Sequence, residues 1–378
     1  MPTINIIKTS PLKNTYRVAK IQGMFDIPQT DKTSFAIKAN LPIEEKPWQI
    51  GLITGASGSG KTSIAHQLWP TSKTQNQHTW TEPSLIDDFP PHLTPQEITL
   101  LLTSVGFSST PAWLRPYNAL STGQKFRATL ARTLAENPTG LIIYDEFTST
   151  VDRTVAAAAS HSIAKTIRRE KTQQFVAVTC HKDIEEWLQP DWVYDTDTQK
   201  FTWGCKRRPQ IEMVIRKGTR QAWPIFREHH YLTGNLAPVA DIYLTYIKLG
   251  DKEERLAGFF AVIQAFGHKG WKRGHRIVIL PDFQGLGIGN CMVETCAQQI
   301  WEQQGKRYRD VTSSPLLVQH RLKKPEMWRL TSAPSMVSPL GAKTARPGCK
   351  TSVGRLTTSW VYVPKEKSKA KAKTNATT

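Results

Sequence analysis

The sequence predicts an α/β fold organised as two domains. Its 378 residues are enough for two ordinary domains, and 39% of them are hydrophobic, so each domain can bury a core. Two glycine-rich turns stand about 230 residues apart, and each follows a short apolar run and precedes a stretch with helical periodicity. Strands that alternate with helices in this way are typical of α/β proteins.

The first part, residues 1–204, alternates apolar runs with helical stretches. Short continuous apolar runs indicate buried parallel strands. A Thr-Pro-Gln-Glu capping signal opens one helix, and the polar, proline-containing segment 71–91 before it is expected to be a loop. The expected strands are 48–54, 141–144 and 175–179, and the expected helices are 62–69, 94–103, 125–134 and 153–170.

The second part, residues 205–364, begins after a boundary near 203–212 and is richer in strands. Residues 331–350 are rich in Ser, Pro, Gly and Lys and are expected to be a loop, and residues 365–378 are expected to be a disordered lysine-rich tail. The expected strands are 211–215, 240–249, 256–265, 276–280 and 357–363, and the expected helix is 287–304.

The positive charge is concentrated in the second part. The formal net charge is +19; residues 205–378 hold 30 Lys and Arg against 12 Asp and Glu, whereas residues 1–204 hold 20 against 19. Only five of the lysines belong to the tail, so most of the excess is expected on folded structure. A basic field attracts polyanions. We therefore favour nucleic acid as a partner over the alternative that these charges are only a solvated surface.

Membrane and secretory signals are not seen in the sequence. No run of 18 or more apolar residues is present, and the first residues lack the pattern of a signal peptide. The five cysteines show no CxxC pair and no zinc-ligand spacing; Cys291 and Cys296 are expected on one helix as small buried thiols. We therefore expect a cytoplasmic protein.

The first glycine-rich turn, residues 55–62, has the spacing G-x-x-x-x-G-K-T of a nucleotide-binding Walker A motif. Its glycines let backbone N–H groups surround the phosphates, Lys61 reaches the β- and γ-phosphates, and the Thr62 hydroxyl binds Mg²⁺. The residues expected to bind ATP here are Gly55, Ser57, Gly58, Ser59, Gly60, Lys61, Thr62 and Ser63.

Further motifs follow this turn in a fixed order. They are Leu-Ser-Thr-Gly-Gln at 120–124, an apolar strand that ends in Asp145 and Glu146, Asp152 shortly after it, and His181 after the next strand. In this order the chain resembles the ATP-binding-cassette (ABC) ATPases over about residues 15–200. The resemblance implies a D-loop at Asp152 and a switch histidine at His181.

The same resemblance implies the remaining parts of an ATPase site. Asp145 would hold Mg²⁺ through water, and Glu146 would polarise the attacking water. The signature segment would contribute Ser121, Gly123 and Gln124. In this family two cassettes pair head to tail, so the single cassette implies an ATP-dependent homodimer.

Departures from the family pattern concern the signature and the Q-loop. Thr122 stands where the signature has its first glycine, and the Q-loop glutamine remains open among Gln75, Gln77 and Gln96. Phe25 is a candidate for stacking on adenine. The short distance between Lys61 and the signature leaves no room for a long coiled-coil insertion, and the missing Q-loop weakens a transporter interpretation.

The second glycine-rich turn has a different pattern, Gln284-Gly-Leu-Gly-Ile-Gly289, between a strand and a helix. A dinucleotide-binding turn would need G-x-G-x-x-G and an acidic residue about 20 positions on. The turn instead resembles motif A of the GNAT acyltransferases, and the resemblance covers about residues 210–364. It implies a mixed sheet that is splayed at the motif strand and an acyl-CoA, with acetyl-CoA expected, bound by Gln284, Gly285, Gly287, Ile288 and Gly289.

The acceptor side is less specific. The aromatic and polar segment 226–232 faintly resembles a segment of phage Mom-type acyltransferases, which modify adenine in DNA, and is read equally well as a helix end. Tyr231 or Tyr308 is a candidate general acid, and Glu228 or His230 a candidate base. Residues 271–276 mix cations with an aromatic ring and suit phosphate contact, or a simple basic hairpin.

These patterns together predict an acyl-CoA-dependent N-acyltransferase with an attached ABC-type ATPase, acting on nucleic acid and most favourably on a DNA base. The alternatives are a protein or small-molecule N-acetyltransferase, and a non-catalytic nucleic-acid-binding module gated by ATP. Binding of coenzyme A separates the transferases from the module.

Overall fold

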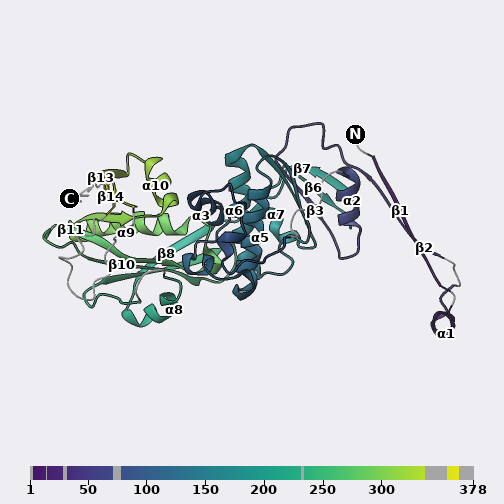
Figure 1. Ribbon diagram of the computed structural model, residues 1–378, viewed down its shortest axis with the longest axis horizontal. Coiled ribbons are helices and arrows are strands. Elements are labelled where there is room, and N and C mark those ends of the chain that lie inside the picture. The colour runs from purple at the N-terminus through teal and green to yellow at the C-terminus, as the bar shows by residue number, and fades with distance from the viewer. Residues whose placement is uncertain are drawn as a thin grey trace, which may run out of the picture. The chain divides into compact units, whose positions relative to one another are not determined.

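The computed structural model divides the chain into two compact units (Figure 1). Unit 1 is made of Met1–Thr79 and Thr129–Arg208, and unit 2 of Trp80–Ala128 and Pro209–Thr378. The sequence prediction grouped residues 80–128 with the first domain, whereas their contacts group them with the second part of the chain. The structure describes residues 3–13, 15–28, 32–70, 78–230, 234–336 and 356–365.

Unit 1 is built on a five-stranded sheet in the order β4-β5-β3-β6-β7. The first four strands run parallel, and β7 is antiparallel to β6. Because β3, β4 and β5 are parallel, the segments that follow them leave the sheet at the same edge. The strands are β3 (Ile50–Thr54), β4 (Gly140–Tyr144), β5 (Gln173–Thr179), β6 (Trp192–Asp195) and β7 (Lys200–Trp203).

An antiparallel hairpin, β1 (Thr3–Pro11) and β2 (Lys32–Asn40), joins the same unit, with helix α1 (Tyr16–Met24) between its strands. The sequence prediction missed this hairpin. Ile4 and Ile37 are buried in one core cluster with Ile64 of α2, so the base of the hairpin packs on that helix. The remaining helices of the unit are α2 (Lys61–Leu68), α6 (Arg153–Glu170), α7 (Glu185–Leu188) and the 3₁₀ turn η3 (Lys182–Ile184).

Unit 2 is built on a seven-stranded sheet in the order β13-β14-β12-β11-β10-β9-β8. All neighbouring strands are antiparallel except β11 and β12, which are parallel. The strands are β8 (Ile211–Lys217), β9 (Asp241–Leu249), β10 (Arg255–Gln264), β11 (Trp271–Ile279), β12 (Arg307–Thr312), β13 (Trp328–Met336) and β14 (Leu356–Tyr362).

The parallel pair β11–β12 opens along its length. Pairing covers only Trp271 to Arg273 of β11, and the rest of that strand pairs with β10 alone. The register of β10 on β11 also shifts after Ala261, which is a β-bulge. The sheet is therefore splayed on the carboxyl side of β11, directly before the second glycine-rich turn.

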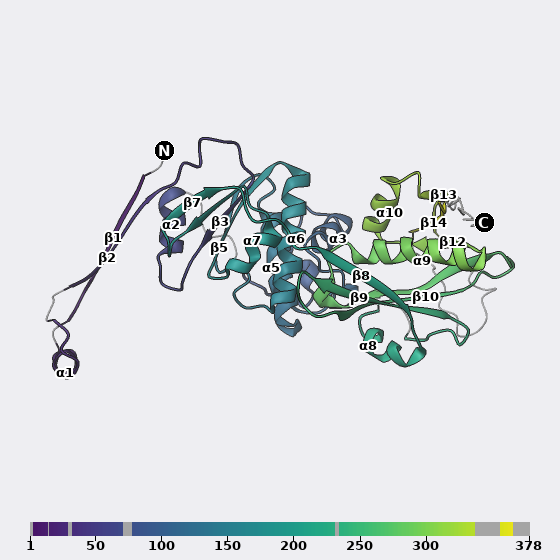
Figure 2. The ribbon, with the colours of Figure 1, turned by 180° about the vertical axis from the view of Figure 1, so that it is seen from behind.

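Both faces of this sheet are covered by helices (Figure 2). Strand residues alternate between the two faces, so the neighbours Phe259 and Phe260 of β10 enter different cores. Phe260 packs with α9 (Ile288–Gln304), and Phe259 with the short helix α8 (Trp223–Arg227) and η4 (Arg220–Ala222).

The segment 80–128 adds small helices to unit 2. α3 begins with the predicted capping box, in which Thr94 and Glu97 exchange hydrogen bonds. α5 continues past residue 128 into unit 1. The elements are η1 (Leu85–Asp88), α3 (Pro95–Ser104), α4 (Thr110–Trp113), η2 (Tyr117–Ala119) and α5 (Thr122–Glu136), and farther along the chain η5 (Pro281–Phe283) and α10 (Pro315–Leu322).

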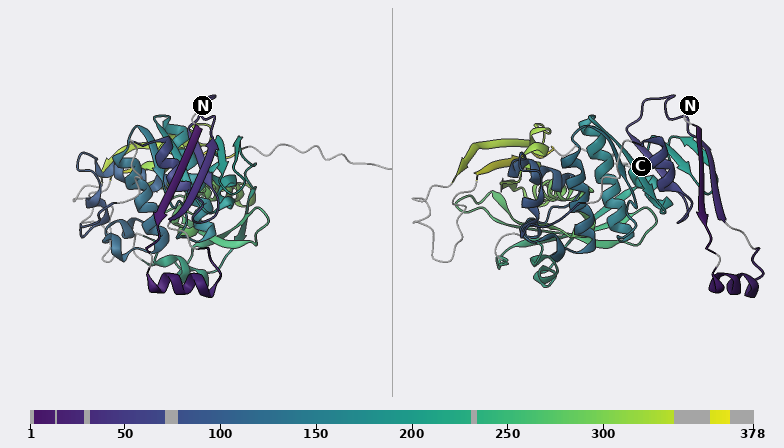
Figure 3. Two further views of the ribbon diagram at one scale, coloured as in Figure 1. Left: turned by 90° about the vertical axis from the view of Figure 1, so that its right-hand side faces the viewer. Right: turned by 45° about the vertical axis from the view of Figure 1, so that its right-hand side comes forward.

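Two sequence predictions need correction. Residues 331–336, expected within a loop, belong to β13, because they pair with β14. Cys291 and Cys296 do share α9 as expected, but only Cys296 is buried. Among the described residues, no helix is long and apolar enough to cross a membrane (Figure 3 gives two further views of the chain).

Candidate nucleotide site and candidate cofactor turn

The first glycine-rich turn connects the buried strand β3 to α2. Gly58 and Gly60 have φ angles of 80° and 86°, in the left-handed region that favours glycine. Position 55 has no room for a side chain, since a Cβ there would lie 2.0 Å from the hydroxyl oxygen of Thr196. The glycines of the motif thus allow the tight backbone path that leads into the N-terminus of α2.

Lys61 is the first residue of α2, and its side chain points back into this turn. Its side-chain amine donates to the carbonyl oxygens of Gly55 at 3.0 Å and Ala56 at 2.6 Å, and the residue is buried. The amine therefore lies inside the curve of the turn, where a phosphate oxygen can replace these carbonyl groups as its acceptor.

The two carboxylates after β4 reach the same place. The Thr62 hydroxyl donates to Asp145 Oδ2 at 2.9 Å, which brings the two predicted Mg²⁺ ligands together. Glu146 adopts φ 52° and accepts a hydrogen bond from Ser149 Oγ at 2.6 Å. A non-glycine residue held in the left-handed region is unusual and is a feature of functional sites.

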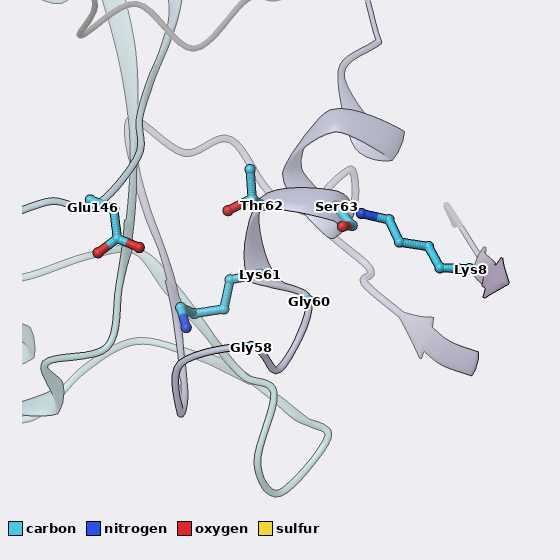
Figure 4. Close-up of a pocket in the computed structure, with 7 residues that line it drawn as sticks. All are labelled: Lys8, Gly58, Gly60, Lys61, Thr62, Ser63 and Glu146. Atoms are coloured by element: carbon cyan, nitrogen blue, oxygen red, sulfur yellow. The ribbon is translucent and has the colours of Figure 1, made fainter. Parts of the chain in front are cut away.

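Lys61, Thr62 and Glu146 line one cavity of about 260 Å³ (Figure 4). The donor set fits a nucleotide polyphosphate with Mg²⁺, because the cavity combines a helix N-terminus, an ammonium group and a hydroxyl paired with a carboxylate. The residues that line the cavity are Lys8, Gly58, Gly60, Lys61, Thr62, Ser63 and Glu146. The sequence predicted all of these except Lys8; the predicted Phe25 does not line the cavity.

Thr196 and Asp197, which follow β6, form hydrogen bonds with the glycine-rich turn; we call this pair the brace. The sequence analysis did not predict it. Asp197 Oδ1 accepts the Ala56 N–H at 2.7 Å, and the hydroxyls of Ser59 and Thr196 are 2.6 Å apart. Lys182, next to His181, forms ion pairs with Asp195 and Asp197. The Ala56 N–H, followed by Lys182, lowers the pKa of Asp197. A carboxylate two residues after a short apolar strand was the only sequence signal for this brace.

The other predicted ATPase residues lie at element ends. Asp152 caps α6, where its carboxylate accepts the N–H groups of Thr154 and Val155. His181 directly precedes η3, and its N–H donates to the Thr179 hydroxyl at the end of β5. Both residues belong to unit 1.

The predicted signature segment begins α5 and belongs to unit 2. Ser121 and Gln124 cap the helix reciprocally: Ser121 N–H donates to Gln124 Oε1 at 3.1 Å, and Gln124 N–H donates to Ser121 Oγ at 3.4 Å. Ser121 and Thr122 are exposed, and Gly123 is half-buried. Of the open Q-loop candidates, Gln96 is exposed on α3, whereas Gln75 and Gln77 lie outside the described residues.

Arg127 connects this helix to the second glycine-rich turn inside unit 2. The side chain is 1% exposed, and Nη1 donates to the Pro281 carbonyl at 2.6 Å. Burial lowers the pKa of Arg127 to about 10, although Asp282 opposes the shift. The segment before α4 contacts the same turn, since Ser108 N–H donates to Gln284 Oε1 at 2.8 Å.

The second glycine-rich turn leads into α9, as expected, and the side chain of Gln284 contacts protein backbone. Its side chain is buried, accepts from Ser108 and donates to the Ile279 carbonyl at 2.9 Å. Both ends of the Gln284 amide therefore bind protein backbone, and the donors predicted for a pyrophosphate at this turn are its backbone N–H groups.

The backbone beyond Gln284 keeps the expected features. Gly285 and Gly287 have φ angles of 98° and 80°. Gly287 is exposed and caps α9, followed by Ile288 and Gly289 in the first turn. The first N–H groups of a helix have no acceptor within that helix, so this end of α9 offers donors to an anion.

Among the predicted transfer residues that the structure describes, Tyr308 is buried and Glu228 is exposed. Tyr308 is 1% exposed in the core cluster with Phe260 and Trp328, and burial raises its pKa well above the ordinary value. A side chain enclosed in this way cannot meet a substrate, which argues against Tyr308 as the general acid. Glu228 is exposed beside His229, at 3.8 Å, and Tyr231 lies outside the described residues.

Only some side chains of the basic stretch 271–276 are exposed. Lys272 is buried and paired with Asp241 at 2.6 Å, and Arg276 is buried and donates to the Asn235 carbonyl. His275 accepts the Ala237 N–H, and burial lowers its pKa to about 4, so the ring is neutral. Arg273 is the exposed cation of this strand, since alternate residues of β11 face inward.

Comparison with known proteins gives similarity to solved structures. The chain is similar to a dimeric ATP-binding cassette in a post-hydrolysis state bound to ADP and Pi, with 14% identity, a TM-score of 0.34, and coverage of 44% of this chain and 89% of that one. It is also similar to cbiO1 from Clostridium perfringens, part of the ABC transporter complex cbiONQ, with 15% identity, a TM-score of 0.34 and coverage of 53% and 88%. No family model and no curated protein matches the chain.

Proposed function

We propose that the chain is an ABC-type ATPase joined to a GNAT-type acyltransferase. The single observation that carries the ATPase part is the cavity shared by Lys61, Thr62 and Glu146. In the proposed site, the Lys61 amine neutralises the β- and γ-phosphates, and Thr62 with Asp145 holds Mg²⁺. Glu146 would polarise the attacking water.

The proposed active form of the ATPase is a homodimer. In ABC-type ATPases the signature of one subunit completes the ATP site of the other. The exposure of Ser121 at the start of α5 supports this arrangement, since its hydroxyl can reach a partner molecule. In that dimer Ser121, Gly123 and the first turn of α5 face the γ-phosphate that is bound by the partner's Walker A turn.

The acyltransferase part rests on the geometry around β11. A mixed sheet that opens between β11 and β12 and a glycine-rich turn leading into α9 are the features expected of a GNAT cofactor site. The acyl-CoA pyrophosphate is proposed to bind the backbone N–H groups of Gly285, Gly287, Ile288 and Gly289. Gln284 has a structural role in this proposal, because it holds the turn against residue 108.

Nucleic acid is the proposed acceptor, with a DNA base favoured and a cytoplasmic location. The support is the excess of 30 basic over 12 acidic residues in 205–378. His230, Glu228 or Tyr231 would supply acid–base catalysis next to the acceptor. An ATP-dependent dimer can hold or distort a duplex, which a base-modifying enzyme requires in order to extrude its target.

The ATPase part is tested by ATP hydrolysis and by molecular mass in solution. We expect wild type to hydrolyse ATP, Lys61→Ala to lose nucleotide binding, and Glu146→Gln to bind ATP without hydrolysis and to accumulate as a dimer. Absence of ATP binding by the wild type would exclude this part of the proposal.

The transferase part is tested by mass spectrometry of nucleosides after DNA or RNA is incubated with the protein, acetyl-CoA and ATP. Acylated nucleosides support the proposal. Acylation of protein without any change in nucleosides favours the protein acetyltransferase, and no thermal shift with acetyl-CoA favours the non-catalytic module.

A variant on α9 sharpens the cofactor test. Cys291 is exposed in the first turn of α9. Cys291→Glu places a negative charge where it stabilises the helix terminus but repels a pyrophosphate. We expect weaker binding of acetyl-CoA with an unchanged or higher Tm, and Cys291→Ser is the matched control.

A further inference from the structure

The N-terminal hairpin places one cation at the nucleotide cavity. Alternate residues of a strand share a face, so Ile4, Ile6 and Lys8 of β1 point the same way. Ile4 is buried and Ile6 is packed against the core cluster that contains Ile64 of α2. The face of β1 that ends in Lys8 is therefore the face turned toward α2.

Lys8 continues this face beyond the apolar contact. It lines the cavity together with Ser63, and its side chain extends toward Ser63 (Figure 4). Within the part of the chain that the structure describes, Lys8 forms no ion pair or hydrogen bond. The ammonium group of Lys8 thus lies at a polar cavity, and no carboxylate among the described residues pairs with it.

The order of residues across the cavity indicates which part of a nucleotide Lys8 meets. Figure 4 shows Glu146 at one side, Lys61 and Gly58 between, and Ser63 with Lys8 at the other side. Glu146 marks the end where the terminal phosphate is hydrolysed. The end of the cavity that Ser63 lines is therefore the end for the phosphate nearest the nucleoside.

We propose that Lys8 is a nucleotide-binding residue contributed by the hairpin, and that its ammonium group contacts the phosphate nearest the ribose. This inference rests on the proposed ATP site. It gives the hairpin a function beyond packing on α2, because a bound nucleotide would add a contact between β1 and the N-terminus of α2.

The experiment compares Lys8→Ala with Lys38→Ala. Lys38 is an exposed lysine of the partner strand β2, opposite Asn5, and it does not line the cavity. We expect Lys8→Ala to weaken binding of both ATP and ADP about tenfold, the effect of losing one charge-assisted hydrogen bond. The loss is equal for the two nucleotides, because the γ-phosphate is not the group contacted.

Additional measurements separate this role from a structural one. Lys8→Arg should restore most of the affinity, and the difference between wild type and Lys8→Ala should shrink at high salt. The kcat of Lys8→Ala at saturating ATP should equal that of wild type, since a uniform binding contact changes KM alone.

The outcomes distinguish the two proposals. If wild type fails to bind ATP, the proposed ATP site is wrong. If wild type binds ATP but Lys8→Ala and Lys38→Ala bind it equally well, the role of Lys8 is wrong while the ATP site remains. A loss confined to ATP, with ADP binding unchanged, contradicts the assignment to the phosphate nearest the ribose.

Discussion

Replacement of Glu294 by glutamine should loosen α9 and, with it, the second glycine-rich turn. Glu294 lies two turns after the start of α9 and accepts hydrogen bonds from His320 at 2.8 Å, Lys324 at 2.9 Å and Trp328 at 3.2 Å. Its side chain is 12% exposed. One carboxylate thus ties α9 to α10 and to the start of β13.

The magnitude follows from the pKa of this carboxylate. Burial alone would raise it, but the bonds from His320, Lys324 and Trp328 outweigh burial and lower the pKa from 4.5 to about 2. The shift corresponds to about 3 kcal/mol of stabilisation by the charged form. Because Lys324 is 35% exposed and therefore screened by solvent, we expect Glu294→Gln to cost about 2 kcal/mol.

The assay is thermal unfolding of the full chain, with the transition of unit 2 resolved by calorimetry. A loss of about 2 kcal/mol lowers that transition by about 6 °C. The pKa of Glu294 is depressed, so its contribution is complete above the unfolded pKa near 4.5 and is lost as the pH falls through about 2. The difference between wild type and variant should therefore be constant near pH 7 and shrink below pH 4.5.

Glu302→Gln provides the control, since Glu302 is an exposed residue of the same helix. Equal transition temperatures for the two variants would refute the reasoning. So would a difference between wild type and Glu294→Gln that stays the same at low pH.

Three further predictions test single contacts. Gly55→Ala should abolish ATP binding, measured by calorimetry, because its Cβ would clash with Thr196; Gly23→Ala, with open space around it, should bind ATP like the wild type. Asp152→Ala should lower the stability of unit 1 by about 1 kcal/mol through loss of the α6 cap, measured by denaturant unfolding. Tyr308→Phe should leave acyl transfer within about twofold of wild type, since the hydroxyl is buried; a larger loss would return Tyr308 to the candidates for general acid.

The nucleotide turn was predictable because it is a local structure. The spacing of Gly55, Gly60, Lys61 and Thr62 forces a tight turn into a helix N-terminus, and both the strand before it and the helix after it appear where expected. The pairing of Thr62 with Asp145 was also implied, since parallel strands bring their carboxyl ends to one edge of the sheet.

The brace and the hairpin were not predictable in the same way. Asp197 and Lys8 reach the turn through hydrogen bonds and packing between segments far apart in the chain. The position of Asp197 just after a short apolar strand is a weak signal, and Lys8 has no local sequence signal that distinguishes it from other surface charges. The burial of Tyr308 is a further example, because a tyrosine in a short alternating strand faces the core or the solvent according to the packing of neighbouring elements.

The sequence by itself determined the two glycine-rich turns and the strands and helices around them, because periodicity and turn chemistry act over a few residues. Only the tertiary structure decided that the segment containing Ser121 belongs with residues 209–378, and that the side chain of Gln284 binds the backbone of residues 108 and 279. Those outcomes depend on which distant surfaces exclude water together, and this information is spread over the whole chain.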